Sequence, residues 1–421
     1  MTNKISNLQI PKISLFITTF LIPFYFLRFD LLNIPTNIFE IAVLVSLLLS
    51  TAYYLLSDRR LVAGPFWLYL LIIFAAVGVF VASDRTAALG ILKGWFVVPA
   101  IFYLLVINTF DKENIKQLSI PLLISVVAIS LWAIMQKLGI ITTLFYQTTD
   151  PSFDQYLGSN FRVFGPFESP NYLAMFLVPA TFLSISAFNY CKRGFAKFAL
   201  ALVYILPVIA LVLSGSRGGA IAAFVAFIIS ICVIARKKSL GTGILIYLLS
   251  FVLIAVLILA IKLIGFDPSS DSIRIQIYQY SWQILKENWL MGIGLGEFQN
   301  NIAGLSVDAI SFKTHALPYA LHPHNIYLAM AIYLGVGGFV SFIATSIWFF
   351  VKAWGARAHS FVLAGAVSAF SAILVHGFVD TTYYKNDLSV LFWLILAVMV
   401  VISSKDEQKQ GDSKPVNQLD S

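Results

Sequence analysis

The chain has 421 residues, of which 59% are hydrophobic and only 11% are charged, and its mean hydropathy is +0.86. Soluble proteins carry about 25% charged residues, so this composition excludes a soluble globular domain and is typical of a polytopic membrane protein. The net charge of +8 does not require a nucleic-acid partner, because basic residues at the ends of membrane spans produce the same excess. Unpaired backbone groups are costly in lipid, so we expect an all-α fold.

The apolar runs predict about twelve transmembrane helices. The first run lacks a cleavage site of small residues, so we expect it to remain as a span rather than be removed as a signal peptide. We expect residues 1–403 to form a single transmembrane domain and the polar tail 404–421 to be disordered. The predicted spans are about 13–30, 37–57, 62–82, 88–109, 118–137, 171–190, 197–214, 218–235, 242–263, 325–351, 360–379 and 387–403.

Basic residues predict the orientation of these spans. Lys and Arg cluster in alternate breaks, so we expect those breaks and both termini to face the cytoplasm. The long loops 138–170 and 264–323 then lie on the outer face. Arginines on this face are mostly single and lie beside apolar or glycine-rich sequence, as Arg162, Arg217 and Arg274 do. Because a lone arginine near membrane depth is costly, each of them is a candidate functional residue.

The loop 264–323 is predicted to contain an amphipathic helix. Between Asp271 and Trp289, apolar residues recur at helical spacing at Ile273, Ile277, Tyr280 and Ile284. We expect this helix to lie on the outer membrane face with Arg274 near its N-terminus; a structural salt bridge is the alternative role for that arginine. The glycine-rich stretch 292–298 lacks the spacing of a dinucleotide-binding motif and the strand before it, so we interpret it as a loop.

Three of the five histidines, His315, His322 and His324, lie in or beside this loop. Pro323 disfavours a helix at His322 and suits the first turn of the following span. His324 would then lie near the positive end of a helix dipole, which favours the neutral imidazole that a general base needs. The alternative is an interfacial histidine in a helix-entry turn.

Two further segments carry outer arginines. In Ser214-Gly-Ser-Arg217-Gly-Gly, glycines would let backbone N–H groups approach an anion, and Arg217 would bind phosphate oxygens; a simple turn with a snorkelling arginine is the alternative. The segment from Arg162 to Asn171 adds Glu168 at the same face. For Asn171, and for Asp380 at the end of a later span, a capping or packing role is favoured.

No metal site is predicted. The acidic pairs with a spacing of four residues lie in loops rich in proline or serine, and no His-x-x-x-His or Walker-type sequence is present. These pairs are Asp150 with Asp154 and Asp267 with Asp271.

Together these features resemble the O-antigen ligase and polymerase superfamily of bacterial inner-membrane proteins. The most specific feature is a ligase pattern of His, then Asn, Ser or Gln, nine residues, Gly, two residues, and Gly, Thr or Tyr. Here it is formed by His324, Asn325, Gly335 and Gly338. The resemblance implies a metal- and cofactor-independent glycosyltransferase of lipopolysaccharide biosynthesis, which moves a glycan from undecaprenyl diphosphate to a hydroxyl of lipid A-core at a periplasmic active site.

The resemblance also implies residue roles. His324 is the expected general base, Arg217 and Arg274 are expected to bind the diphosphate, and Arg162 would bind either the diphosphate or anionic groups of the acceptor. The residues expected to support this site are His322, Asn325, Gly335 and Gly338. Related polymerases and protein O-oligosaccharyltransferases carry similar His-Asn patterns and remain alternatives. A lipid-linked glycan transporter is a more remote one, because its charges would gather near the bilayer midplane, where Lys93 is the main candidate.

Overall fold

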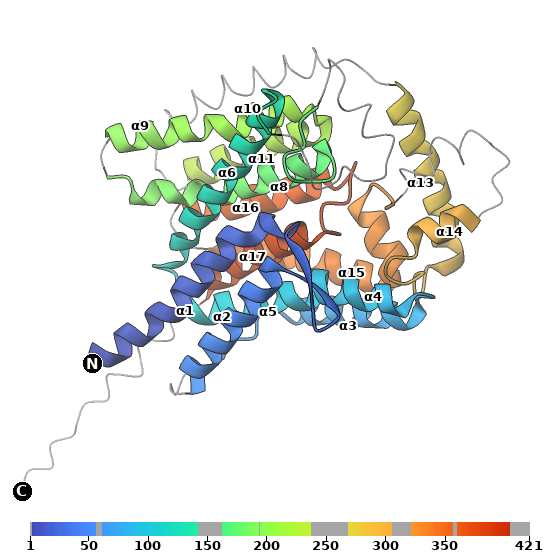
Figure 1. Ribbon diagram of the computed structural model, residues 1–421, viewed down its shortest axis with the longest axis horizontal. Helices are drawn as coiled ribbons and strands as arrows, with labels where there is room; N and C mark the ends of the chain where they lie inside the picture. Colours follow the sequence, from blue (N-terminus) through green and yellow to red (C-terminus); the bar gives the residue numbers. More distant parts are fainter. Residues whose placement is uncertain are drawn as a thin grey trace, which may run out of the picture.

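The computed structural model describes residues 2–55, 61–141, 162–192, 194–236, 268–304, 321–356 and 360–404. These residues are mostly helical, with one short two-stranded hairpin among them (Figure 1). Eight of the described helices are long and apolar enough to cross a membrane, and three shorter apolar helices accompany them. The chain is therefore an α-helical polytopic membrane protein. The total of about twelve spans stays a prediction, because the ninth, 242–263, lies outside the described residues.

The described helices and strands have the following bounds. The first half contains α1 (Thr2–Leu21), η1 (Ile22–Phe24), β1 (Arg28–Leu31), β2 (Ile34–Asn37), α2 (Ile38–Leu55), α3 (Phe66–Val81), α4 (Arg85–Leu92), η2 (Lys93–Val97), α5 (Val98–Thr109), η3 (Ile115–Leu118) and α6 (Ser119–Lys137). The second half contains α8 (Pro170–Ser184), η5 (Ile185–Tyr190), α9 (Gly194–Val203), α10 (Ile205–Ser214), α11 (Arg217–Arg236), α13 (Pro268–Asn288), α14 (Phe298–Gly304), α15 (Ile326–Gly355), α16 (Ser360–His376) and α17 (Asn386–Ser403).

The first predicted span, 13–30, is wrong at its C-terminal end. The helical segment ends at Phe24, and a β-hairpin occupies residues 28–37. Its two-residue turn places Leu32 and Asn33 at φ 53° and 63°. The run of apolar residues hid a period-two alternation of Phe29 and Leu31 with charged neighbours, which suits a strand rather than a helix.

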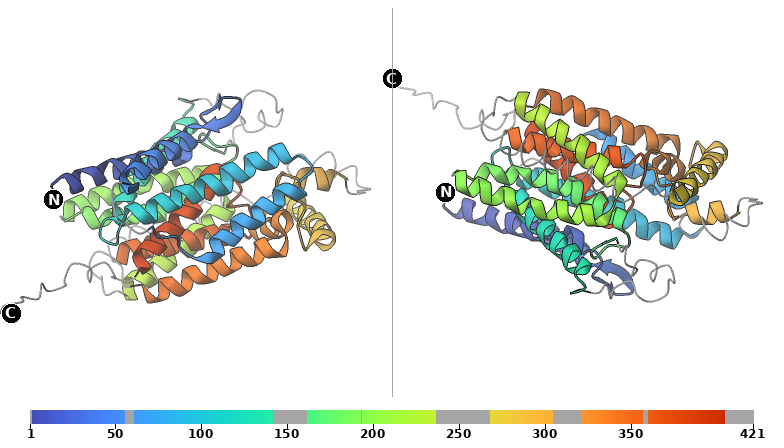
Figure 2. Two further views of the ribbon diagram at one scale, coloured as in Figure 1. Left: turned by 90° about the horizontal axis from the view of Figure 1, so that it is seen from below. Right: turned by 90° about the horizontal axis from the view of Figure 1, so that it is seen from above.

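Helix α17 forms the centre of the bundle. It packs against α5, α8, α15 and α16, and 83% of its residues are buried inside the protein. Its sequence is apolar all round, as expected for a helix covered on every side. In the peripheral segment Gly194–Ser214, only 17% of an 18-residue apolar stretch is buried, which is typical of a helix that faces lipid. Figure 2 shows the long helices running side by side along one axis, with α13 at the end opposite the N-terminus.

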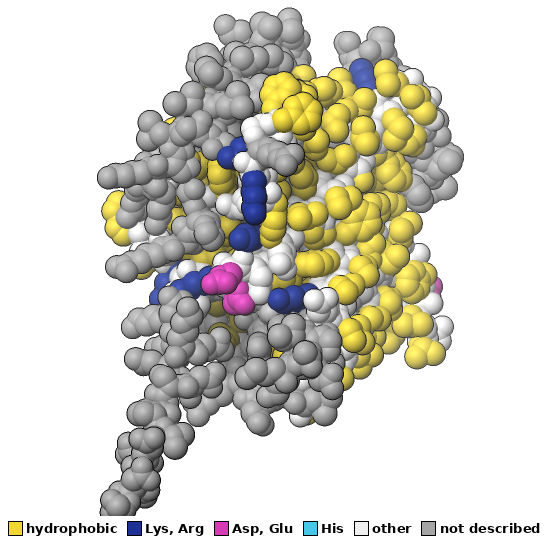
Figure 3. Space-filling view, turned by 90° about the vertical axis from the view of Figure 1, so that its left-hand side faces the viewer, with side chains coloured by type: hydrophobic (Ala, Val, Ile, Leu, Met, Phe, Trp, Pro, Cys, Tyr) yellow, Lys and Arg dark blue, Asp and Glu magenta, His cyan; other side chains and the backbone are white. Residues whose placement is uncertain are grey.

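Basic side chains gather at the end of the bundle that holds the N-terminus (Figure 3). Lys12 lies 6.0 Å from the centre of the Phe110 ring, and Lys116 lies 5.7 Å from that of Tyr190. These are the clusters from which we predict a cytoplasmic face, and lysines over aromatic rings are common at a membrane interface. The orientation itself stays a prediction.

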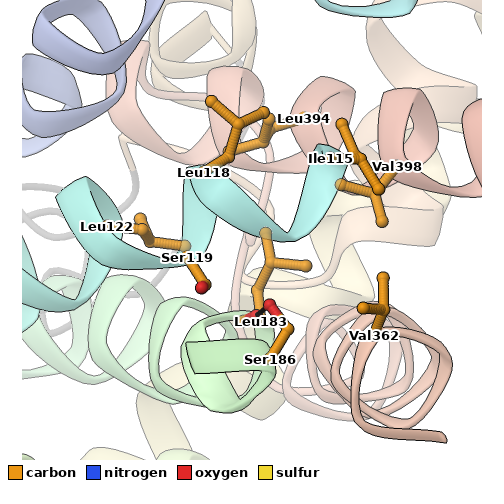
Figure 4. A pocket seen from close by; sticks show the side chains of 9 residues that line it. All are labelled: Ile115, Leu118, Ser119, Leu122, Leu183, Ser186, Val362, Leu394 and Val398. Carbon is orange, nitrogen blue, oxygen red and sulfur yellow. Dashed lines mark hydrogen bonds between the residues drawn. The ribbon is translucent and has the colours of Figure 1, made fainter. Parts of the chain in front are cut away.

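A small apolar pocket lies between α6, α8, α16 and α17 (Figure 4). Its lining includes Leu183 and Ser186 at the end of the α8–η5 segment and Val362 at the start of α16. It therefore lies at the opposite end of these helices from Pro170 and His376, and so away from the predicted histidine site.

Candidate functional site

The His-Pro-His-Asn segment forms a tight turn into α15. His324 adopts φ 49°, a left-handed conformation that is uncommon for residues other than glycine and is often found at functional sites. The next residue caps the helix: Oδ1 of Asn325 accepts hydrogen bonds from the backbone N–H groups of Tyr327 (2.9 Å) and Leu328 (3.0 Å). Its Nδ2 donates to the carbonyl of Phe378 (3.0 Å). Asn325 thus fixes the histidine turn to the loop after α16.

That loop brings a carboxylate to the histidine. Asp380 is only 4% exposed, and its Oδ1 lies 3.2 Å from Nδ1 of His324. Its Oδ2 lies 4.0 Å from the guanidinium of Arg274 on α13. We expected a capping or packing role for Asp380, whereas the structure pairs it directly with the histidine. The histidine turn, α13 and the loop after α16 therefore meet at one point.

The carboxyl group of Asp380 is ionised at neutral pH. Burial by itself would raise its pKa, but the hydrogen bond with His324 and the neighbouring His324, His376 and Arg274 side chains lower the pKa to about 2. A carboxylate only accepts hydrogen bonds, so Nδ1–H of His324 is the donor; in the neutral ring, Nε2 is then the acceptor atom. This is the tautomer in which an imidazole acts as a general base.

Helix α13 holds Arg274 at the site. One turn after Arg274, the hydroxyl of Tyr278 donates to the backbone carbonyl of His324 (2.9 Å), and burial raises the pKa of this tyrosine to about 12. We expected the apolar stripe of α13 to lie on the membrane. Instead Ile277 and Ile284 are buried in the protein core, since α13 packs against α15. The stripe thus orients Arg274 toward Asp380.

The segment Ser214–Arg217 joins α10 to α11 and is called the arginine turn. Gly215 adopts φ 61° and ends α10, as a glycine commonly does, and Arg217 is the first residue of α11. The start of α11 is in close contact with the end of α16: a Cβ atom on Gly218 would lie 2.8 Å from the ring of His376. The residue next to Arg217 therefore touches His376, four residues before Asp380.

Arg162 ties two segments together. Its Nε donates to the carbonyl of Ser214 (2.8 Å) at the end of α10, and its guanidinium donates to Oδ1 of Asn171 (3.3 Å) in the first turn of α8. The N-cap of α8 is Ser169 rather than Asn171. These contacts favour a positioning role for Arg162 on the arginine turn.

His322 is held in an aromatic cluster. Its Nδ1 lies 3.0 Å from the hydroxyl of Tyr333, and its ring lies against Trp95 and Tyr384. Burial, together with the neighbouring His324 and Lys385 side chains, lowers the pKa of His322 to about 3. His322 is therefore neutral at physiological pH and positions the turn without carrying charge. His315 lies outside the described residues.

The packing of α15 explains why the ligase pattern has glycine at two positions. Gly335 lies at a kink of α15 with φ 66°, and a Cβ atom there would lie 2.2 Å from the carbonyl oxygen of Leu290. The backbone N–H of Val336 donates to the carbonyl of Trp289 (2.9 Å) across the same contact. Gly338 makes room for the side chain of Leu334. The pattern thus combines a histidine, a helix cap and the surface on which the end of α13 docks.

One ion pair with a buried lysine was not predicted from the sequence. Lys385, which is 7% exposed, pairs with Glu168, and its ammonium lies 4.2 Å from the centre of the Tyr172 ring. The sequence signal was a lysine beside Asp387 at the start of an apolar span, where charge is costly. Burial lowers the pKa of Lys385, while Glu168 opposes that shift. The pair joins the segment of Arg162 to that of Asp380.

Lys93 also has a carboxylate partner. Lys93 is the first residue of the π-helical turn η2, and its Nζ lies 2.9 Å from Oε2 of Glu40. Across the described ranges, no three His, Cys, Asp or Glu side chains gather as metal ligands would. The acidic pairs considered from the sequence, Asp150 with Asp154 and Asp267 with Asp271, do not have both side chains within those ranges.

A family comparison bears on this arrangement. Residues 202–343 match the family model described as O-antigen ligase. This match supports membership of the O-antigen ligase and polymerase superfamily. The matched segment contains Arg217, Arg274 and His324, whereas Asp380 and Lys385 follow it. A search of curated proteins found no match. Superfamily membership supports glycosyl transfer of the ligase or polymerase type, acting on lipid-linked glycans in a membrane.

Proposed function

We propose that this superfamily member is an O-antigen ligase, a metal- and cofactor-independent glycosyltransferase. It moves a glycan from undecaprenyl diphosphate to a hydroxyl of lipid A-core. The observation that carries the proposal is the contact of His324 with the buried, ionised Asp380 (3.2 Å) beside Arg274. The ligase pattern that ends at Gly335 and Gly338 favours a ligase over the other members of the superfamily.

His324 acts as the general base. Its Nε2 removes the proton of the acceptor hydroxyl while the acceptor oxygen forms a bond to the anomeric carbon of the glycan. The bond between that carbon and the diphosphate oxygen breaks, and the lipid diphosphate leaves with the electron pair. Asp380 holds the imidazole in the required tautomer and stabilises the imidazolium that forms. His324 thus removes the proton, and Asp380 balances the positive charge that results.

Arg217 and Arg274 bind the leaving diphosphate. A guanidinium forms paired, charge-assisted hydrogen bonds with phosphate oxygens, and these strengthen as the leaving group gains charge. Gly218, the residue after Arg217, contacts His376, and Arg274 approaches Asp380. Both contacts support a location of the two arginines near His324. We assign Arg162 to the same turn through its bond to Ser214, with direct phosphate contact as its second role. The donor supplies the energy through its glycosyl–phosphate bond, so no nucleotide is needed.

The proposed location is the bacterial inner membrane, with both termini in the cytoplasm and His324 at the periplasmic side. Two observations support this orientation. Basic side chains gather at the N-terminal end of the bundle (Figure 3), and α13 lies at the opposite end (Figure 2). Residues 1–403 would then form one transmembrane domain, with loops 138–170 and 264–323 on the periplasmic side and residues 404–421 on the cytoplasmic side.

The test is a transfer assay with purified protein in lipid vesicles, a lipid-linked glycan donor and lipid A-core, without added metal. A ligase gives one discrete larger lipid A-core product. A ladder that grows on the carrier lipid indicates a polymerase, and a glycan attached to added protein indicates a protein O-oligosaccharyltransferase. Movement of the donor across the bilayer with no product on any acceptor would indicate a transporter and overturn the proposal.

A further inference from the structure

The β1–β2 hairpin is amphipathic. Its register pairs Phe29 with Thr36 and Leu31 with Ile34, and residues directly opposite one another lie on the same face. One face therefore carries Phe29, Leu31 and Ile34, which are 45%, 45% and 55% exposed. The opposite face carries Arg28, Asp30, Pro35 and Asn37. An exposed apolar sheet face of this kind requires a partner other than water.

The tip of the hairpin is both strained and apolar. Leu32 and Asn33 have φ values of 53° and 63°, as in a type I′ turn. Asparagine tolerates this conformation, but leucine is disfavoured there because its Cβ crowds the backbone. Leu32 is also 89% exposed, so burial within the protein does not offset the strain. An apolar environment around the tip would offset it.

The position of the hairpin indicates what that environment is. It joins the apolar helical segments Gln9–Phe24 and Ile38–Leu55, so its base begins where membrane-embedded helices end. On its polar face Arg28 and Asp30 are exposed, while Asn37 at the base of this face is buried. Nζ of Lys93 donates to the carbonyl of Pro35 (2.5 Å), and the guanidinium of Arg28 lies 5.7 Å from the Tyr25 ring, so the base of the hairpin is held on the protein. Figure 2 shows the hairpin projecting from the side of the bundle.

We propose that the β1–β2 hairpin lies in the membrane interface at the histidine end of the bundle. Its partner is the phospholipid leaflet, and Phe29, Leu31, Leu32 and Ile34 enter the boundary between head groups and acyl chains. A two-stranded hairpin alone is only marginally stable in water, so the lipid contact completes its folding. The contact with Lys93 then links this anchor to the π-helical turn that carries Trp95, which lies against His322. The proposal does not depend on glycan transfer.

The experiment places a nitroxide label on each face of the hairpin. The two cysteines of the chain, Cys191 and Cys232, are replaced by serine, and a single label is attached to Leu31→Cys or, as the matched control, Asp30→Cys. Electron paramagnetic resonance of protein in phosphatidylcholine vesicles then compares collisions with oxygen, which concentrates in lipid, and with a water-soluble nickel chelate. The proposal predicts that oxygen collisions dominate at position 31 and nickel collisions at position 30. Dominant nickel collisions at position 31, or shielding from both reagents by covering protein, would overturn it.

The turn provides a second test. Asparagine suits the backbone of position 32, so Leu32→Asn should fold at least as well as the parent while removing the apolar tip. In that background the label at position 31 should lose its oxygen preference and gain collisions with nickel. An unchanged preference would overturn the assignment of Leu32 to the lipid contact.

Discussion

The imidazole of His324 and the carboxylate of Asp380 lie 3.2 Å apart, although 56 residues separate them in the sequence. Arg274 approaches the other carboxylate oxygen at 4.0 Å. The carboxylate therefore faces a positive charge on one side and the proposed base on the other. This arrangement keeps Asp380 ionised and suits the proposed role of Nε2 of His324 toward an acceptor hydroxyl.

The proposed phosphate contacts predict that lysine cannot replace arginine. Arg217→Lys and Arg274→Lys keep the charge but lose the planar fork that holds two phosphate oxygens, so transfer should fall by about 10²-fold. The measurement is the initial rate of transfer at several donor concentrations. Ser186→Ala at the remote pocket is the matched control and should transfer normally. Full activity in both lysine variants would rule out paired phosphate binding.

The ion pair of Lys385 with Glu168 predicts unequal costs for its two partners. Glu168→Ala strands the ammonium of Lys385, whose side chain is 9% exposed, and should cost about 3–5 kcal/mol of stability. Lys385→Met strands a carboxylate that is 33% exposed, so its cost should be smaller. Thermal unfolding in detergent gives both values. Equal costs, or a larger cost for Lys385→Met, would contradict the assigned burial.

The kink of α15 predicts a strong effect of Gly335→Ala. Alanine would be strained at φ 66°, and its Cβ would also lie 2.2 Å from the carbonyl oxygen of Leu290. Gly139→Ala isolates the first effect, because Gly139 has φ 72° with open space around it. We expect about 1–2 kcal/mol of destabilisation at Gly139 and clearly more at Gly335, measured by the same unfolding assay. Similar losses at both positions would contradict the close docking of Leu290 on the kink.

The aromatic cluster around His322 predicts a pH-dependent stability. The pKa of His322 is about 3 in the folded protein and 6.5 as an ordinary histidine, so its contribution is complete above pH 6.5 and is lost as the pH falls toward 3. Asp380, with a folded pKa of about 2 against 3.8, loses its contribution only below about pH 3.8. His322→Gln should therefore flatten the fall in melting temperature between pH 6.5 and 4. An unchanged slope would show that other groups cause it.

Much of this arrangement could be predicted from sequence. The apolar runs indicated helical spans, and the His-Pro-His-Asn segment with its glycines indicated the turn, because a proline and a helix cap act locally. The hairpin at 28–37 was not predicted, because the long apolar run before it outweighed the short alternation of apolar and charged residues. The partnership of His324 with Asp380 could not be derived, because it depends on how the loop after α16 packs against α13.

The apolar stripe of α13 shows the same limit. Its helical spacing was visible, but spacing alone cannot tell whether Ile277 and Ile284 meet lipid or protein. Because α13 packs against α15, both isoleucines meet protein, and the glycine at the kink makes that packing possible. Lys385 was missed for a similar reason, because its partner Glu168 lies more than 200 residues away.

The most direct measurement is the rate of glycan transfer by His324→Ala and Asp380→Asn in vesicles, each with its melting temperature. If His324 is the base, His324→Ala should transfer at least about 10²-fold more slowly than the parent. Asp380→Asn should lose about 10²- to 10⁴-fold, because the amide favours the wrong tautomer and no longer balances the imidazolium. Both should stay folded with a nearly unchanged KM for donor. Near-normal transfer by folded His324→Ala would contradict the account.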